Sequence, residues 1–110
     1  MPYILGMYNF IETKLFTQLI RKYLSDEEYA ELQKALLLNP EAGSVISGSG
    51  GVRKIRWRAQ GRGKRSGYRV IYFVKMTTQT FWMLTIYPKN VSDNIPAHIL
   101  KQIREEIENE

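Results

Sequence analysis

Hydrophobic residues recur at two different spacings along the chain, and these spacings predict the order of its elements. Alternation around Tyr8 and Phe10 predicts a short strand over residues 7–12. Thr13 is the expected N-cap of a helix over residues 14–24, because its hydroxyl is an acceptor for an N–H of the first turn. Helical spacing predicts that the buried face of this helix comprises Leu15, Phe16, Leu19, Ile20, Tyr23 and Leu24.

A second helix is predicted to follow at once and to run to about Leu38. Ser25 and Glu28 form a capping box at its start, and Asn39-Pro40 ends it because the residue before proline avoids the helical region. Its expected buried side is Tyr29, Leu32, Ala35 and Leu36. The two helices are therefore expected to form a hairpin that covers one face of a sheet.

The second half of the chain predicts three strands and a closing helix. A loop rich in Gly and Ser, residues 42–51, precedes strands over residues 52–58, 67–74 and 80–87, and Pro96 begins the last helix. The middle strand is almost continuously apolar, which predicts burial on both faces. We expect a single α+β domain over residues 1–110 with the order β-α-α-β-β-β-α. Its sheet is mostly antiparallel, with the hairpin on one face and a C-terminal helix. Residues 1–7 are treated as an N-terminal extension.

Charge is segregated along the chain. The window from Ala42 to Ser92 holds ten basic residues and no acidic one, and since the whole chain is +5, the remainder carries −5. Segregated charge of this kind creates a field that attracts a polyanion, and RNA is the expected ligand.

Composition excludes several classes of chemistry. The chain has no cysteine and one histidine, so no disulfide framework, thiolate nucleophile or metal site is predicted, and no cofactor is expected. Its apolar runs are too short to span a bilayer, and its N-terminus has no signal-peptide pattern, so we expect a cytoplasmic protein that does not contact membranes.

One group of residues fits metal-free RNA cleavage, which needs a base, an acid and cations around the phosphate. Lys54 and Arg56 share one face of their strand, and Arg69 begins the next strand. Tyr87 and Lys89 end the third strand, so all five converge if the three strands are neighbours. Crowded cations lower the pKa of a lysine, which would suit Lys54 to acid–base work.

Other basic residues are candidates for holding RNA phosphates: Arg53, Arg58, Arg62, Lys64 and Arg65. The alternative for the alternating cations is a solvated sheet face, although such faces usually mix both signs of charge. For Arg69 the alternative is a hydrogen-bonded structural arginine. Among the aromatic residues, Tyr87 or Trp57 is the best candidate for stacking on a base.

The run from Asn39 to Phe73, NPEAGSVISGSGGVRKIRWRAQGRGKRSGYRVIYF, together with Tyr87-Pro88-Lys89-Asn90, resembles the HigB-like branch of the RelE superfamily of toxins. The resemblance extends from about Tyr8 to the closing helix. It implies a ribonuclease fold, ribosome-dependent cleavage of mRNA in the ribosomal A site, and a cognate antitoxin. The antitoxin would be a HigA-like helix-turn-helix protein. The toxin would bind operator DNA only through this antitoxin.

Roles follow position by position from the resemblance. Lys54 and Arg56 match a basic pair on the second strand of RelE-type toxins, where Arg56 departs from lysine and hardly releases its proton. Arg69 matches the arginine that stabilises the scissile phosphate, and Lys89 falls near a second family arginine. The C-terminal tyrosine of the family falls near Ile95, so Tyr87 is a candidate substitute.

Two other functions are compatible with the same residues. A non-catalytic RNA- or DNA-binding module would use the basic face without cleavage, because phosphate affinity needs no acid–base chemistry. A pure interaction protein would fill the basic groove with an acidic partner.

Overall fold

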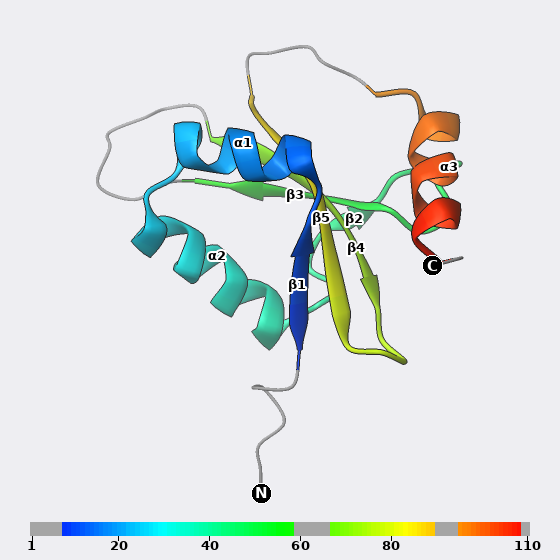
Figure 1. Ribbon diagram of the computed structural model, residues 1–110, viewed down its shortest axis with the longest axis horizontal. Coiled ribbons are helices and arrows are strands. Elements are labelled where there is room, and N and C mark those ends of the chain that lie inside the picture. Colours follow the sequence, from blue (N-terminus) through cyan, green and yellow to red (C-terminus); the bar gives the residue numbers. More distant parts are fainter. Residues whose placement is uncertain (1–7, 59–66, 90–94, 109–110) are drawn as a thin grey trace, which may run out of the picture.

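The computed structural model describes residues 8–58, 67–89 and 95–108, which form a sheet with helices on both faces (Figure 1). The strands lie in the order β1-β5-β4-β3-β2, with β1 parallel to β5 and the other neighbours antiparallel. The elements in chain order are β1 (Asn9–Glu12), α1 (Lys14–Tyr23), α2 (Asp26–Leu38), β2 (Ser44–Val45), β3 (Arg53–Trp57), β4 (Tyr68–Lys75), β5 (Thr80–Pro88) and α3 (Ala97–Glu108). The predicted α+β class, the mostly antiparallel sheet, the helical hairpin and the C-terminal helix are confirmed.

Both predicted caps are present in the hairpin. Thr13 Oγ1 accepts a hydrogen bond from the Phe16 N–H at 3.0 Å and donates to the Leu84 carbonyl at 2.8 Å. Ser25 Oγ accepts from the Glu28 N–H at 3.1 Å, and the Glu28 carboxylate accepts from the Ser25 N–H at 2.8 Å. The first cap therefore joins the start of α1 to β5, and the second satisfies N–H groups that a helix leaves without partners.

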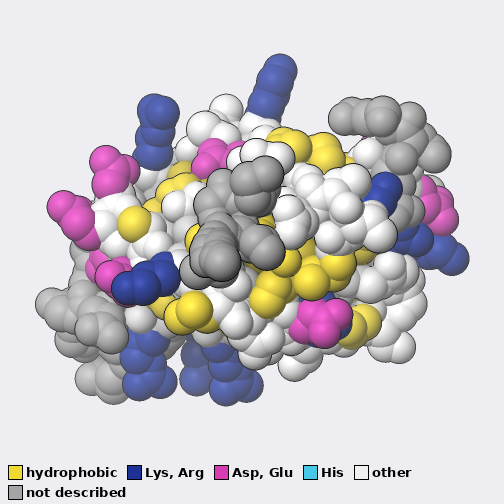
Figure 2. All heavy atoms as spheres, turned by 90° about the horizontal axis from the view of Figure 1, so that it is seen from below, with side chains coloured by type: hydrophobic (Ala, Val, Ile, Leu, Met, Phe, Trp, Pro, Cys, Tyr) yellow, Lys and Arg dark blue, Asp and Glu magenta, His cyan; other side chains and the backbone are white. Residues whose placement is uncertain are grey.

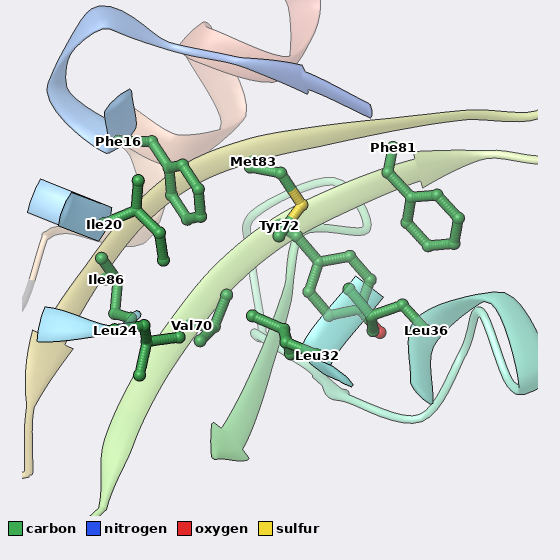
Figure 3. Close-up of a cluster of buried hydrophobic side chains, with 10 residues drawn as sticks. All are labelled: Phe16, Ile20, Leu24, Leu32, Leu36, Val70, Tyr72, Phe81, Met83 and Ile86. Atoms are coloured by element: carbon green, nitrogen blue, oxygen red, sulfur yellow. The ribbon is translucent and has the colours of Figure 1, made fainter. Parts of the chain in front are cut away.

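The hairpin buries the larger core against the sheet (Figure 3). Phe16, Ile20 and Leu24 follow one another at intervals of four, so they point to the same side of the helix. The prediction for Leu15 was wrong, because this side chain is 49% exposed. One residue turns the helix by about 100°, so Leu15 faces away from a narrow stripe centred on Phe16. The core residues are Phe16, Ile20, Leu24, Leu32, Leu36, Val70, Tyr72, Phe81, Met83 and Ile86.

The other face of the sheet is covered in part by α3. Leu100 packs with Ile71, Phe73 and Leu84 in a second core cluster. The Arg104 guanidinium lies 5.5 Å from the centre of the Phe73 ring, a cation–π distance. Gly50 has φ +78°, and a Cβ there would come within 2.7 Å of Arg104 Nε. A glycine at this position therefore permits both the turn and the close approach of α3.

The predicted loop over residues 42–51 contains β2, which the sequence did not reveal. Ser44 pairs with Lys54 and Val45 pairs with Arg53 across an antiparallel ladder. A strand of two residues has no alternation to detect, and only its partner β3 makes it visible. Within the described residues, no helix has the length and apolar character needed to cross a membrane.

Candidate nucleic-acid interface

The alternation of β3 separates its side chains between the two faces of the sheet. Ile55 and Trp57 pack against the core beneath the hairpin, whereas Lys54 and Arg56 are exposed. Because successive side chains of a strand point to opposite faces, Lys54 and Arg56 lie on the face that carries α3. The predicted division of β3 into an apolar and a basic side is therefore present.

Three of the candidate residues form a row across neighbouring strands. Arg56 lies opposite Arg69 in the β3–β4 ladder, and Arg69 lies opposite Tyr87 in the β4–β5 ladder. Side chains paired in this way have Cβ atoms about 4.5–5.5 Å apart, and two like charges at that separation destabilise a sheet. The row is therefore a place where an anion would relieve repulsion.

A hollow of about 180 Å³ lies at this end of the sheet. The Lys89 N–H donates to the Gly67 carbonyl at 2.9 Å, which holds the residue after β5 beside the start of β4. We call this hollow the cationic hollow, and its lining is Arg56, Trp57, Arg58, Gly67, Arg69 and Lys89. Four basic side chains around one small space are opposite in sign to the charge of a phosphate group.

A view from below shows how charge is distributed over one end of the molecule (Figure 2). Several Lys and Arg side chains lie together at the lower left of this view, and others project from its upper edge and its right side. Asp and Glu side chains are scattered over the same view, and hydrophobic side chains occupy a band across its middle.

A second hollow, of about 80 Å³, adjoins the same row of residues. Lys54 and Tyr87 lie in its wall, and Leu100 brings α3 to its other side. We call it the apolar hollow, and its lining is Ile46, Lys54, Ile71, Tyr87, Ile95 and Leu100. The five candidate residues thus fall around two adjoining hollows rather than one.

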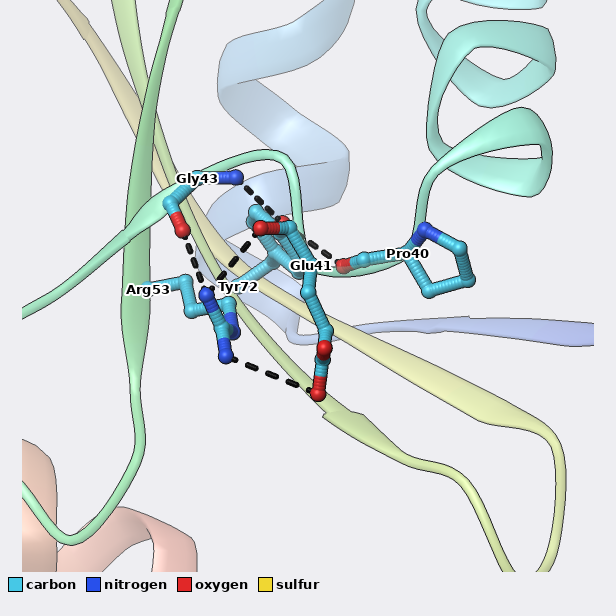
Figure 4. Close-up of polar contacts among 5 residues, drawn as sticks. All are labelled: Pro40, Glu41, Gly43, Arg53 and Tyr72. Carbon is cyan, nitrogen blue, oxygen red and sulfur yellow. Dashed lines mark hydrogen bonds and ion pairs between the residues drawn. The ribbon is translucent and has the colours of Figure 1, made fainter.

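Arg53 faces away from both hollows and contacts the loop before β2 (Figure 4). Its Nη1 donates to the Glu41 and Gly43 carbonyls at 3.1 and 2.6 Å, and its Nη2 lies 3.7 Å from the Glu41 carboxylate. These contacts give Arg53 a structural role, and its contact with RNA stays a prediction.

Tyr72 completes this polar cluster from β4. Its hydroxyl donates to the Pro40 carbonyl at 2.8 Å and accepts from the Gly43 N–H at 3.0 Å. Burial raises the pKa of Tyr72, and the Gly43 N–H works in the opposite direction. A Cβ on Gly43 would come within 3.0 Å of both the Lys54 carbonyl oxygen and the Tyr72 ring, so glycine lets the loop lie against the sheet.

A third hollow, of about 370 Å³ and so larger than the two above, lies between the first turns of α2 and the end of β3. Glu27, Glu28 and Glu31 line it together with Trp57 and Arg58. Its carboxylates would repel a phosphate group, so size alone does not identify the RNA site.

Three predicted phosphate contacts, Arg62, Lys64 and Arg65, belong to residues 59–66 and lie outside the described residues. Among the residues that are described, no group of three His, Asp or Glu side chains is placed to hold a metal ion. Reasoning from the residues missed Ile46 and Leu100 as neighbours of the site, because their approach depends on how the loop after β2 and α3 pack onto the sheet, whereas the resemblance had already placed Ile95 near it.

Comparison with solved structures relates this fold to known toxins. The E. coli toxin RelE, as a variant with two arginine-to-alanine changes in the free state, matches with a TM-score of 0.59 and 19% identity over 89% of this chain and 97% of its own. A chain of the archaeal RelE–RelB complex from Pyrococcus horikoshii OT3 matches with a TM-score of 0.54 and 19% identity over 78% of this chain and 99% of its own. A chain of the intact E. coli RelBE complex matches with a TM-score of 0.51 and 23% identity over 72% of this chain and 93% of its own.

A family model described as the RelE toxin of the RelE/RelB toxin–antitoxin system matches residues 9–108. The match spans every helix and strand described above. The HigB-like branch stays a prediction, since these comparisons reach only the wider family. The chain therefore belongs to the RelE family of toxins.

Proposed function

We propose that this toxin is an endoribonuclease that cleaves mRNA in the ribosomal A site and so stops translation. The observation that carries the proposal is the Arg56–Arg69–Tyr87 row, which brings two permanent cations and a phenol together across three strands. Family membership supports it, because it makes the chain the toxin of a toxin–antitoxin pair. The cationic hollow supplies a place for a phosphate beside this row.

The proposed chemistry uses side chains alone. Lys54 acts as the base, or as a stabiliser, when the ribose 2′-OH attacks the adjacent phosphorus. Arg56 and Arg69 stabilise the charge that develops on the phosphorane oxygens. Tyr87 or Lys89 then gives a proton to the leaving 5′-oxygen. Arg58, which also lines the cationic hollow, and the loop cations Arg62, Lys64 and Arg65 hold neighbouring phosphates.

The cation row also suits the inhibition of such a toxin. An antitoxin that placed carboxylates between Arg56 and Arg69 would relieve their repulsion as a phosphate does. We propose a HigA-like helix-turn-helix antitoxin in this role, with the toxin acting in the cytoplasm where its ribosomes are. The solved complexes of RelE with RelB from E. coli and P. horikoshii support a protein antitoxin as the partner, and the HigA-like type is our proposal.

The test is inducible expression in a bacterium with mapping of mRNA 5′ ends, comparing the wild type with Arg69→Ala. We expect growth arrest and new cuts within translated regions for the wild type, and at least a hundredfold fewer cuts for the variant, because removing one preorganised donor commonly costs about 10²–10³ in rate. Lys75→Ala is the matched control, since it removes a cation from the opposite end of the same strand.

Purified wild-type protein is then assayed with RNA in the presence and absence of translating ribosomes. Cuts only on ribosomes support the full proposal, and cuts on free RNA would remove its ribosomal part. Salt-dependent binding that leaves the RNA intact would instead support the alternative function, a non-catalytic RNA- or DNA-binding module. An Arg69→Ala protein that is folded and fully toxic would remove Arg69 from the site.

A further inference from the structure

The alternation of side chains along β5 shifts partway along the strand. Phe81 and Met83 both pack into the core beneath the helical hairpin, as residues two positions apart in a strand should. Strict alternation would continue on that face with Thr85 and then Tyr87. The core instead contains Ile86, and Tyr87 packs against the cluster beneath α3. The alternation therefore changes by one residue between Met83 and Ile86.

The shift coincides with one extra residue in β5. Tyr72 pairs with Met83 and Ile71 pairs with Thr85, so the β4–β5 ladder skips Leu84. We call Leu84 the extra residue of β5. An extra residue of this kind, as in a β-bulge, re-aims the side chains that follow it, and such irregularities are frequent beside active sites.

The extra residue decides which side chain lies beside Arg69. The register next to the turn between β4 and β5, continued without interruption, would bring Ile86 opposite Arg69. Tyr87 would then point into the core beneath the helical hairpin, because a slip by one residue moves a side chain to the other face. With Leu84 skipped, Tyr87 lies opposite Arg69 and lines the apolar hollow.

Thr13, directly after β1, contacts this irregular part of β5. Its N–H donates to the Met83 carbonyl at 3.1 Å, and its hydroxyl donates to the Leu84 carbonyl at 2.8 Å. As the N-cap of α1, the same hydroxyl accepts from the Phe16 N–H at 3.0 Å. Capping uses a hydroxyl only as an acceptor, and a hydroxyl has one proton to donate. The proton of the Thr13 hydroxyl is therefore given to the extra residue of β5.

Resting on the proposed function, in which Tyr87 acts at the cleaved phosphate, we propose that Thr13 is a positioning residue for Tyr87. Its hydrogen bonds to β5 hold the extra residue in place, and the shifted register that follows presents Tyr87 beside Arg69. Thr13 is not among the residues that line the cationic or the apolar hollow. It therefore acts through β5, without touching RNA.

The test separates the two hydrogen bonds of the Thr13 hydroxyl. Thr13→Asp keeps an acceptor for the Phe16 N–H, but an ionised carboxylate has no proton for the Leu84 carbonyl. Thr13→Ser keeps both bonds. Ser25→Asp is the matched control, because it places the same carboxylate at the N-cap of α2, where the capping bonds lie within α2 itself.

The position of the Tyr87 ring is measured by NMR on the full chain without RNA. We expect nuclear Overhauser effects between this ring and the Leu100 methyl groups, which line the same hollow, in the wild type, Thr13→Ser and Ser25→Asp. In Thr13→Asp we expect these effects to be lost. If Thr13→Asp does not fold, Thr13→Val is compared with Ser25→Ala, since each of these removes one helix cap. Unchanged Tyr87 contacts in the folded Thr13 variant would overturn the proposal.

Cleavage of mRNA on translating ribosomes is the second measurement. We expect Thr13→Asp to lower kcat by about tenfold or more with little change in KM, because a misplacement of about 1 Å can cost about 10²-fold in rate. Thr13→Ser and Ser25→Asp should keep the wild-type kcat. If the wild type cuts no mRNA, the proposed function fails, and the NMR comparison still decides whether Thr13 positions Tyr87. A wild-type kcat despite a displaced ring would remove Tyr87 from the chemistry and support its positioning by Thr13.

Discussion

The two faces of the same sheet use one strand for opposite purposes. On β4, Val70 and Tyr72 point into the core beneath the hairpin, whereas Arg69 and Ile71 point toward the two hollows. The hairpin face is closed by buried apolar side chains, and its helix starts are capped. The α3 face is covered only in part, and like charges lie side by side where it is open. Stability is therefore concentrated on one face, and the other tolerates unfavourable electrostatics.

The largest difference should come from one substitution on each face. Phe16→Ala empties a fully buried position beneath the hairpin, and we expect a loss of about 3–5 kcal/mol in the free energy of unfolding. Arg56→Gln keeps the aliphatic stem but removes a repulsion, so we expect a gain of about 0.2–0.5 kcal/mol. Urea unfolding measures both. A clear loss of stability in Arg56→Gln would show that the cation row contributes to the fold.

A smaller effect should follow from the polar cluster at the edge of the hairpin core. Tyr72→Phe leaves the buried Gly43 N–H and the Pro40 carbonyl without their phenol partner, which should cost about 1–3 kcal/mol. Tyr23→Phe is the control, because its ring pairs with Tyr68 at 5.2 Å whether or not the hydroxyl is present. The comparison uses urea midpoints at neutral pH. Equal midpoints for the two variants would mean that water replaces the Tyr72 bonds at no cost.

The smallest effect should be a decline of stability at high pH. Burial raises the pKa of Tyr29, and a hydrogen bond of 2.7 Å from its hydroxyl to the Glu12 carboxylate raises the pKa further. An unfolded tyrosine ionises near pH 10, so above that pH the folded state retains a proton that the unfolded state loses. Stability therefore falls as the pH rises from 9 to 11.

Tyr29→Phe removes this contribution, so its urea midpoint should decline less over the same interval than that of the wild type. Since lysines titrate in the same range, the difference between the two proteins is the quantity to compare. If the urea midpoints of the two proteins decline in parallel, the Tyr29 proton does not cause the loss of stability at high pH.

Local features of the fold were predictable from the sequence, whereas long-range ones were not. The caps at Thr13 and Ser25 and the end of α2 before Pro40 depend on neighbouring residues, and they were predicted correctly. The pairing of β1 with β5 joins residues about 70 positions apart, and β2 needs β3 to exist at all. The prediction that Leu15 is buried was wrong for a related reason. Its spacing fits a helix face, but the sheet beneath the helix sets how much of that face is buried.

The candidate site divides in the same way. Alternation on β3 was enough to place Lys54 and Arg56 on one face. Arg69 was recognisable as a candidate because it is a charged residue within the apolar run of β4. No sequence pattern fixes the register that brings Tyr87 beside Arg69, nor the contact of Arg53 with Glu41. Registers and ion pairs of this kind are settled by tertiary packing, so the roles assigned to these residues await the experiments above.

The position of β1 has a consequence for how the protein is made. Its partner β5 begins at Thr80, so within the described residues the strand that comes first in the sequence pairs with the one that comes last. The Thr13 hydroxyl likewise can donate its hydrogen bond to the Leu84 carbonyl only after Leu84 has been synthesised. Contacts so distant in sequence are slow to form because a long loop must close first. The helical hairpin can therefore form early on the nascent chain, but a chain interrupted before β5 lacks Phe81, Met83 and Ile86 of the hairpin core, and β1 has no strand to pair with until β5 is present.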